Sequence, residues 1–300
     1  MPLPPLTLGV CSWSLQVGGV DELKRLMGDL GVSATQIACG DPHHASWLEG
    51  DAMPEAALAS GLTLTGAMLG FSGEDYTTPR TIQATGGFGD PATRAERLDR
   101  LSWALDRTVK LGLTDLTLHA GFLPEVDHPD RPAMLETLAK AGRMAAEKGV
   151  TLAFETGQES ALLLRLTLDE LNSPNIKVNF DPANMLLYDM GDPIHAVEIL
   201  AQEIRSVHLK DARRPTIPGN WGEEVPLGQG EVNIPQFLKT LKAVGYAGPL
   251  VIEREVGDQA ARIRDIRHGL DFVRRCLAEP AHADDGRPGV HNSEKPRVEP

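Results

Sequence analysis

The chain has 300 residues, of which 41% are hydrophobic and 24% charged, and its formal net charge is −13. This composition is typical of a globular protein with a sizeable core. The acidic residues are scattered. A nucleic-acid or anionic-membrane partner would require clustered Lys and Arg instead, so neither partner is expected.

The cysteine spacing and the lack of long apolar runs favour a location in the cytoplasm. The three cysteines, Cys11, Cys39 and Cys276, are widely spaced and form no C-x-x-C motif, which favours a reducing environment. The N-terminus lacks the basic and apolar stretches of a signal peptide, and no run reaches the roughly 18 apolar residues of a membrane span. We therefore expect a cytoplasmic protein with no membrane partner.

Eight short apolar runs alternate with amphipathic segments along the chain. The runs are rich in Val, Ile, Leu and Ala and contain few charges, as expected for parallel strands that are covered on both faces. In chain order they are 6–12, 35–39, 62–69, 115–119, 150–155, 177–181, 206–210 and 249–253.

The segments between these runs carry hydrophobic residues at helical spacing. The predicted helices cover 20–30, 94–111, 131–148, 159–171, 192–203, 233–244 and 257–277. Asn233 is the expected N-cap of the helix that follows it, with Gln236 in the capping-box position.

This alternation predicts an α/β fold, a single-domain (β/α)8 TIM barrel over residues 1–278, since such barrels typically have about 250 residues. A doubly wound sheet is the alternative, but the expected G-x-G-x-x-G phosphate loop is absent from the sequence. Residues 70–93 and 211–232 are expected to be long loops that cover the active site. Residues 279–300 are expected to form a disordered tail.

Each of the last four predicted strands ends in an acidic or imidazole side chain: Glu155, Asp181, His208 and Glu253. A buried carboxylate is unfavourable unless a cation or proton accompanies it. One such residue alone could be a helix cap or a paired surface group. Four in register at the active end of a barrel predict a single metal site. Three carboxylates and one imidazole favour Mn²⁺, and the same set also suits Mg²⁺, Co²⁺ or Zn²⁺.

The chain resembles the sugar phosphate isomerase/epimerase family of xylose isomerase-like barrels, most specifically from residue 150 onward. This family includes ketose 3-epimerases, hydroxypyruvate isomerases, and inosose isomerases and dehydratases. The likeness is carried by Phe154-Glu155-Thr156, Asn179-Phe-Asp181-Pro-Ala-Asn184, Val207-His208-Leu-Lys210-Asp211, Pro226-Leu-Gly228-Gln-Gly230-Glu-Val and Gly248-Pro-Leu-Val-Ile-Glu253-Arg-Glu255.

The resemblance implies one divalent metal ion held by Glu155, Asp181, His208 and Glu253, a small sugar or sugar phosphate as substrate, and assembly into a homodimer or homotetramer. It also implies proton abstraction next to a carbonyl through a metal-stabilised enediolate. Glu155 and Glu253 are the expected acid and base, each binding the metal through one oxygen. Two carboxylates on one cation should titrate as a coupled set, which lets one of them hold a proton near neutral pH.

Six residues are candidates for substrate contact: Trp13, His119, Gln158, Asn184, Lys210 and Arg214. Asn184 stands where ketose 3-epimerases usually have a His that contacts substrate, which weakens a free-ketose assignment. The six-residue step from the metal His to a substrate-binding Arg is kept, as His208 to Arg214. Structural roles remain open for the others: core packing for Trp13, helix capping for Gln158, hydrogen bonding for His119, and a salt bridge for Lys210.

Three other functions compete with an isomerase or epimerase. A metal-dependent lyase, either a keto-inositol dehydratase or a keto-glycoside eliminase, would abstract the same kind of proton. A hydrolase of abasic DNA would need a His-rich multi-zinc cluster and a basic surface, which neither the nine scattered histidines nor the net charge of −13 supports. For a non-catalytic sugar-binding barrel, Glu155→Gln would cause no loss of rate, whereas an enzyme would lose much of its rate.

Overall fold

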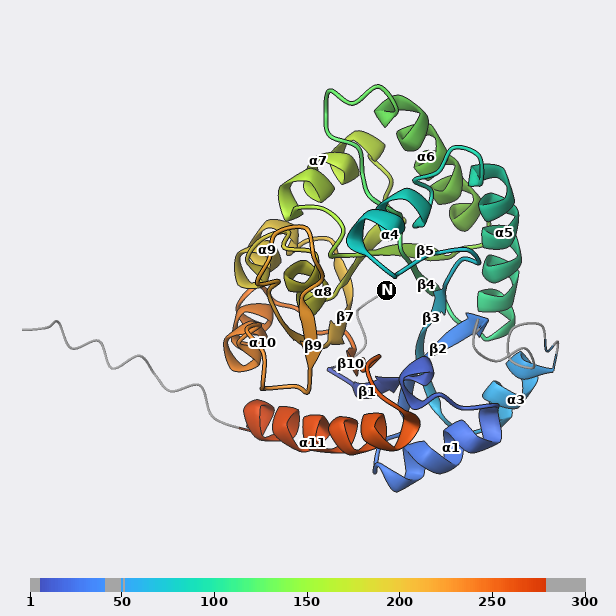
Figure 1. Cartoon of the computed structure of the whole chain (residues 1–300). Helices are drawn as coiled ribbons and strands as arrows, with labels where there is room; N and C mark the ends of the chain where they lie inside the picture. The colour runs from blue at the N-terminus through green and yellow to red at the C-terminus, as the bar shows by residue number, and fades with distance from the viewer. Residues whose placement is uncertain (1–5, 41–49, 51, 279–300) are drawn as a thin grey trace, which may run out of the picture.

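The computed structural model describes residues 6–40, 50 and 52–278, and its centre is a closed barrel of eight parallel strands (Figure 1). The predicted TIM barrel is therefore confirmed, and each predicted strand lies within two residues of the observed one. The barrel strands are β1 (Leu8–Cys11), β2 (Ala34–Gly40), β3 (Thr63–Leu69), β4 (Asp115–Leu118), β5 (Thr151–Glu155), β6 (Ile176–Phe180), β7 (Ile204–Leu209) and β10 (Leu250–Ile252).

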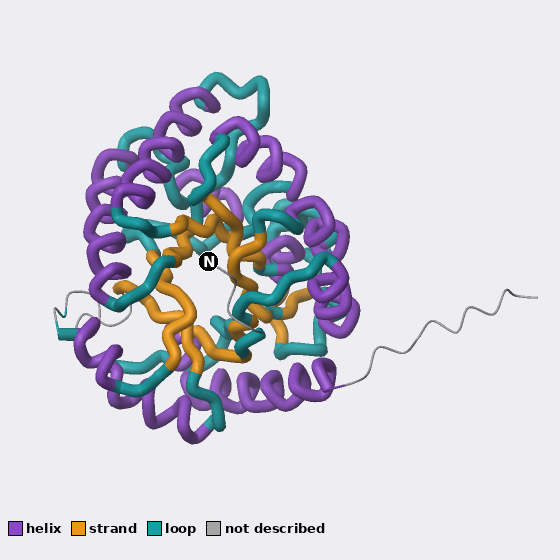
Figure 2. The backbone as a smooth tube through the Cα atoms, turned by 180° about the vertical axis from the view of Figure 1, so that it is seen from behind, coloured by secondary structure: helices purple, strands orange, loops and turns teal. Residues whose placement is uncertain are grey.

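Helices surround this barrel on all sides, as Figures 1 and 2 show from opposite directions. Each buries an apolar stripe against the strands, for example Leu101 and Leu105 of α5, and every helix that the sequence predicts is present. The outer helices are α1 (Val20–Asp29), α3 (Met53–Ala59), α5 (Arg94–Lys110), α6 (Arg131–Glu147), α7 (Ala161–Leu171), α9 (Pro193–Leu200), α10 (Ile234–Ala243) and α11 (Gln259–Ala278).

The two segments expected to be loops contain short elements, so that expectation was incomplete. Residues 70–93 include helix α4 (Pro79–Thr85), which begins with a capping box between Thr78 and Thr81. Residues 211–232 include the antiparallel strands β8 (Asp211–Arg213) and β9 (Glu223–Val225). A cap or a single strand pair stabilises these elements, and they are too short for hydrophobic periodicity to reveal them.

Three other short elements were also not predicted: η1 (Ser12–Leu15), α3 and α8 (Pro182–Leu187). Helix α8 begins directly after β6, and its N-cap is Asp181, one of the predicted metal ligands. The predicted tail, residues 279–300, lies outside the described residues. No helix within the described ranges is both long and apolar enough to cross a membrane.

Candidate functional site

The four strand-end residues converge at one end of the barrel. One ligand atom from each of Glu155, Asp181, His208 and Glu253 lies within 4.8 Å of the others, and all four residues are buried. The Nδ1 atom of His208 is 2.8 Å from Oε1 of Glu155, 3.5 Å from Oε2 of Glu253 and 3.8 Å from Oδ2 of Asp181. The parallel register places their strands side by side, because β10 pairs with β7, β7 with β6, and β6 with β5.

Two carboxylate oxygens in this cluster have no hydrogen-bond partner although they are buried. Oδ1 of Asp181 accepts a hydrogen bond from the backbone N–H of Asn184 at 2.9 Å, but Oδ2 accepts none. Oε2 of Glu155 lies 3.1 Å from Nε2 of His119 and also accepts no hydrogen bond. Leaving such oxygens unpaired costs free energy that a bound cation would offset. The donor set therefore fits a divalent ion.

Gln36 on β2 orients His208. Oε1 of Gln36 is 2.5 Å from Nε2 of His208, and Nε2 of Gln36 donates to the Thr117 hydroxyl at 2.8 Å. An amide oxygen only accepts hydrogen bonds, so the imidazole donates from Nε2 and turns Nδ1 toward the carboxylates. Gln36 was not predicted as a site residue. A polar side chain inside the apolar run 35–39 is the feature of the sequence that could have revealed it.

Lys210 neutralises part of the negative charge. Its ammonium group is buried, donates to Oε2 of Glu253 at 2.9 Å and to Oδ1 of Asn184 at 3.3 Å, and forms an ion pair with Glu255. The internal salt bridge that the sequence left open for Lys210 is thus present. This contact holds one oxygen of Glu253 in a fixed direction beside His208.

Burial and the neighbouring charges shift the pKa values of three clustered residues, raising those of Asp181 and His208 and lowering that of Glu253. Burial raises the pKa of Asp181 well above its usual value despite the nearby ammonium of Lys210. Although burial opposes ionisation of Glu253, Lys210 and His208 hold its pKa well below the usual range. Burial would lower the pKa of His208, but the nearby carboxylates of Glu253 and Glu155 raise it above its usual value. A bound metal ion would compete with protons for these groups, because ligands bind a metal in their deprotonated form.

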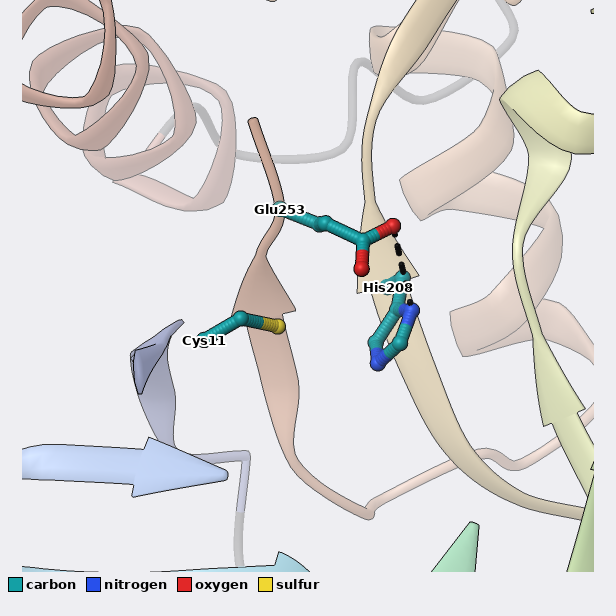
Figure 3. Close-up of side chains that lie close together, drawn as sticks. All are labelled: Cys11, His208 and Glu253. Carbon is teal, nitrogen blue, oxygen red and sulfur yellow. Dashed lines mark ion pairs between the residues drawn. The ribbon is translucent and has the colours of Figure 1, made fainter. Parts of the chain in front are cut away.

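Cys11 forms a second possible ligand group with His208 and Glu253. Figure 3 shows the Glu253 carboxylate directed at the His208 ring, with the Cys11 side chain extending toward them from β1. Burial raises the pKa of the Cys11 thiol to about 12. Since the thiolate is the form that binds metals, the oxygen-rich group is the better candidate site.

Trp13, a candidate for substrate contact in the sequence, contacts one of the predicted metal ligands. Its indole N–H donates to Oε1 of Glu253 at 2.6 Å, and its ring centroid is 5.8 Å from that of His208. With Lys210 on Oε2, both oxygens of Glu253 have a donor. Trp13 therefore positions a predicted metal ligand.

The remaining candidates for substrate contact are His119, Asn184, Gln158 and Arg214, and of these Arg214 makes its contacts away from the four clustered residues. His119 and Asn184 both contact Glu155, the amide of Asn184 at 3.4 Å from Oε1. Gln158 is buried, and its side chain interacts with the Tyr188 hydroxyl. The guanidinium of Arg214 instead binds Asp189 and the Gly191 carbonyl oxygen, and no hydrogen bond or ion pair joins it to the four clustered residues. Its contact with substrate stays a prediction.

Comparison with known proteins gives several related chains. The chain is 28% identical over 204 residues to the L-ribulose-5-phosphate 3-epimerase UlaE of Escherichia coli (strain K12), covering 64% of this chain and 68% of that protein. A xylose isomerase domain protein from Planctomyces limnophilus is 32% identical, with a TM-score of 0.79 over 92% of this chain and 97% of that one. An L-ribulose 3-epimerase shares the fold at 18% identity, with a TM-score of 0.68 over 91% and 94% of the two chains.

The family comparison agrees with the barrel and with the resemblance found in the sequence. The family described as "Xylose isomerase-like TIM barrel" matches residues 20–276, which is nearly the whole described structure. The chain therefore belongs to the xylose isomerase-like TIM barrel family.

Proposed function

We propose that the protein is a divalent-metal-dependent isomerase or epimerase that acts on a keto sugar or sugar phosphate. The observation that carries this proposal is the buried cluster of three carboxylates and one imidazole, in which two oxygens have no hydrogen-bond partner. The similarity to an L-ribulose-5-phosphate 3-epimerase supports the same class of reaction.

Glu155, Asp181, His208 and Glu253 would hold the ion, for which Mn²⁺ is the first expectation. When bound, the ion would polarise the carbonyl oxygen and the neighbouring hydroxyl oxygen of the sugar, which makes the C–H bond between them more acidic. The burial of the cluster strengthens this effect, because electrostatic interactions are stronger where water is excluded.

Glu155 and Glu253 are the groups proposed to move the proton. One carboxylate takes the proton from carbon to give an enediolate, and the other returns a proton to the opposite face, which inverts the centre. Trp13 and Lys210 hold Glu253 in place during both steps. Oε2 of Glu155 has no hydrogen-bond donor to compete with a proton.

Polar groups around the cluster are proposed to orient the substrate. Nδ1 of His119 is buried and has no hydrogen-bond partner among the described residues, and the buried side chain of Gln158 interacts with the Tyr188 hydroxyl. Asn184 lies between Glu155 and Lys210, where its amide can also bind a hydroxyl group. These groups would fix which carbon of the sugar faces the two glutamates.

Solvent-deuterium incorporation tests the proposed function. The Mn²⁺-loaded protein is incubated in D₂O with a panel of keto sugars and their phosphate esters, and products are analysed by NMR and mass spectrometry. An epimer or isomer that carries one solvent-derived deuterium supports the proposal. Loss of water or of an aglycone would identify a lyase instead, and a panel without exchange would contradict the proposal.

A further inference from the structure

We propose that Cys11, His208 and Glu253 form a second metal position, the sulfur site, which takes a thiophilic ion such as Zn²⁺ or Cd²⁺ and thereby excludes Mn²⁺ from the cluster. The sulfur site itself depends only on contacts among these three residues. Its effect on Mn²⁺ rests on the proposed function, because the sulfur site and the cluster share His208 and Glu253.

The three residues of the sulfur site come from strands that are neighbours around the barrel. Cys11 is the last residue of β1, Glu253 follows β10 directly, and His208 lies in β7. Strand β10 pairs in parallel with both β1 and β7, and Val10 lies beside Ile252. The residues that follow this pair are Cys11 and Glu253, which therefore reach the same level of the barrel.

The three side chains lie close enough for one ion to bind them all. One ligand atom from each lies within 4.8 Å of the other two, and all three residues are buried. In Figure 3 the Cys11 sulfur and the Glu253 carboxylate both point toward the His208 ring. Ligand atoms of a tetrahedral Zn²⁺ ion, at about 2.0–2.3 Å from the metal, lie about 3.3–3.8 Å from one another. Small side-chain rotations would therefore bring the three donors to one ion.

The thiol and the imidazole already face a common point. Sγ of Cys11 donates to Oε1 of Gln36 at 3.9 Å, and the same oxygen lies 2.5 Å from Nε2 of His208. A thiol is a weak hydrogen-bond donor, so little free energy is lost when Sγ leaves this contact for a metal ion.

The donor set of the sulfur site selects a different class of ion from that of the cluster. Thiolate, imidazole and carboxylate groups are all ligands of Zn²⁺ in proteins, and thiolate sulfur favours soft ions over Mn²⁺ or Mg²⁺. The S–H bond breaks as the S–metal bond forms, and the proton passes to the solvent. The thiolate and the carboxylate then neutralise the two charges of the ion, which burial requires.

An ion in the sulfur site is expected to disable the cluster. His208 and Glu253 are also two of its four proposed ligands, together with Glu155 and Asp181. An ion that draws His208 and Glu253 toward Cys11 withdraws them from the other two carboxylates. Because Glu253 is also a proposed proton-transfer group, a thiophilic ion should both compete with Mn²⁺ and inhibit the proposed reaction.

Cadmium binding tests the sulfur site without any turnover. Cys276 on α11 is partly exposed, so Cys276→Ser serves as the parent protein and removes adventitious binding at that thiol. Titration of the parent with Cd²⁺ should produce ultraviolet charge-transfer absorption from a thiolate, with one ion per chain. The absorption should be lost when Cys11→Ser or Cys11→Ala is added, with circular dichroism showing that each variant is folded.

Cys39→Ser in the same parent is the matched control. Cys39 is also buried, on β2, but belongs to neither candidate metal group among the described residues, so its variant should keep the absorption. X-ray absorption of the Zn²⁺-loaded parent should show one sulfur at about 2.3 Å, which Cys11→Ser replaces by nitrogen or oxygen at about 2.0–2.2 Å. Zinc without a sulfur ligand in the parent, or cadmium absorption that survives loss of the Cys11 thiol, would overturn the sulfur site.

Competition tests the exclusion of Mn²⁺ separately. The electron paramagnetic resonance signal of free Mn²⁺ should rise as Cd²⁺ displaces the ion from the parent. In Cys11→Ser at least about tenfold more Cd²⁺ should be needed, the lower end of the effect of losing a contact at a metal site. Equal release from both proteins, or Cd²⁺ and Mn²⁺ bound together, would contradict the exclusion. If Mn²⁺ does not bind the parent at all, the metal assignment of the proposed function fails, while the cadmium absorption still decides the sulfur site.

Discussion

Oε1 of Gln36 lies 2.5 Å from Nε2 of His208, although β2 and β7 are separated by two strands around the barrel. The contact crosses the barrel interior and selects the imidazole nitrogen that faces the carboxylates. A side chain that is not among the proposed metal ligands thus sets the orientation of His208, which is one of them.

Replacing Gln36 should weaken metal binding. In Gln36→Leu the imidazole loses its acceptor, and we expect the Mn²⁺ dissociation constant to rise about 10- to 100-fold, the usual effect of losing such a support. Gln36→Glu keeps an acceptor oxygen and is the matched control. Isothermal titration calorimetry measures both, and equal affinities for the Leu variant and the wild type would show that Gln36 does not orient His208.

Replacing either proposed proton-transfer group should slow exchange more than it weakens sugar binding. For Glu155→Gln and Glu253→Gln at saturating Mn²⁺ we expect the rate of deuterium exchange to fall about 10²- to 10⁴-fold, the contribution typical of general acid–base catalysis. Glu198→Gln, an exposed residue of α9, is the control. Exchange at the wild-type rate in both site variants would leave a non-catalytic sugar-binding barrel as the better explanation.

Much of the fold was predictable because each barrel strand is a short apolar run between amphipathic segments. The four clustered residues were predictable for a related reason, because an acidic or imidazole side chain is unusual at the end of an apolar run. They are Glu155, Asp181, His208 and Glu253. Contacts between distant segments were not predictable. The bonds from Gln36 to His208 and from Trp13 to Glu253 join residues 172 and 240 positions apart, and no local pattern encodes them.

Lys210 should stabilise the fold as well as the site. Because its ammonium is buried against Glu253 and Glu255, Lys210→Met leaves two carboxylates without their cation. We expect the metal-free protein to lose about 3–5 kcal/mol of unfolding free energy. The exposed pair Lys148–Asp106 is the control, and Lys148→Met should cost about 0–1 kcal/mol. Similar losses in both variants, measured by urea denaturation, would show that burial of Lys210 has no special effect.

Glu159 should make stability depend on pH. Burial raises the pKa of its carboxyl from 4.5 to about 8, so between these values the unfolded chain is ionised while the folded chain keeps the proton. Folding therefore takes up a proton in this range. As a result, the free energy of unfolding should fall as the pH rises from about 5 to 8. Glu159→Gln should remove this loss, which is on the order of a few kcal/mol.

Urea denaturation at pH 5 and pH 8 checks the effect of Glu159. The variant should gain free energy of unfolding relative to the wild type at pH 8 and should differ little from it at pH 5. A difference between the two proteins that is the same at both pH values would show that the Glu159 carboxyl has an ordinary pKa in the folded chain.

Crystallography of the Mn²⁺-loaded protein is the most direct test of the candidate site. Anomalous diffraction is expected to give one strong peak per chain, within about 2.0–2.6 Å of oxygen or nitrogen atoms of Glu155, Asp181, His208 and Glu253. A map with no peak among these four side chains, or with the ion bound by other residues, would contradict the assignment on which the proposed reaction depends.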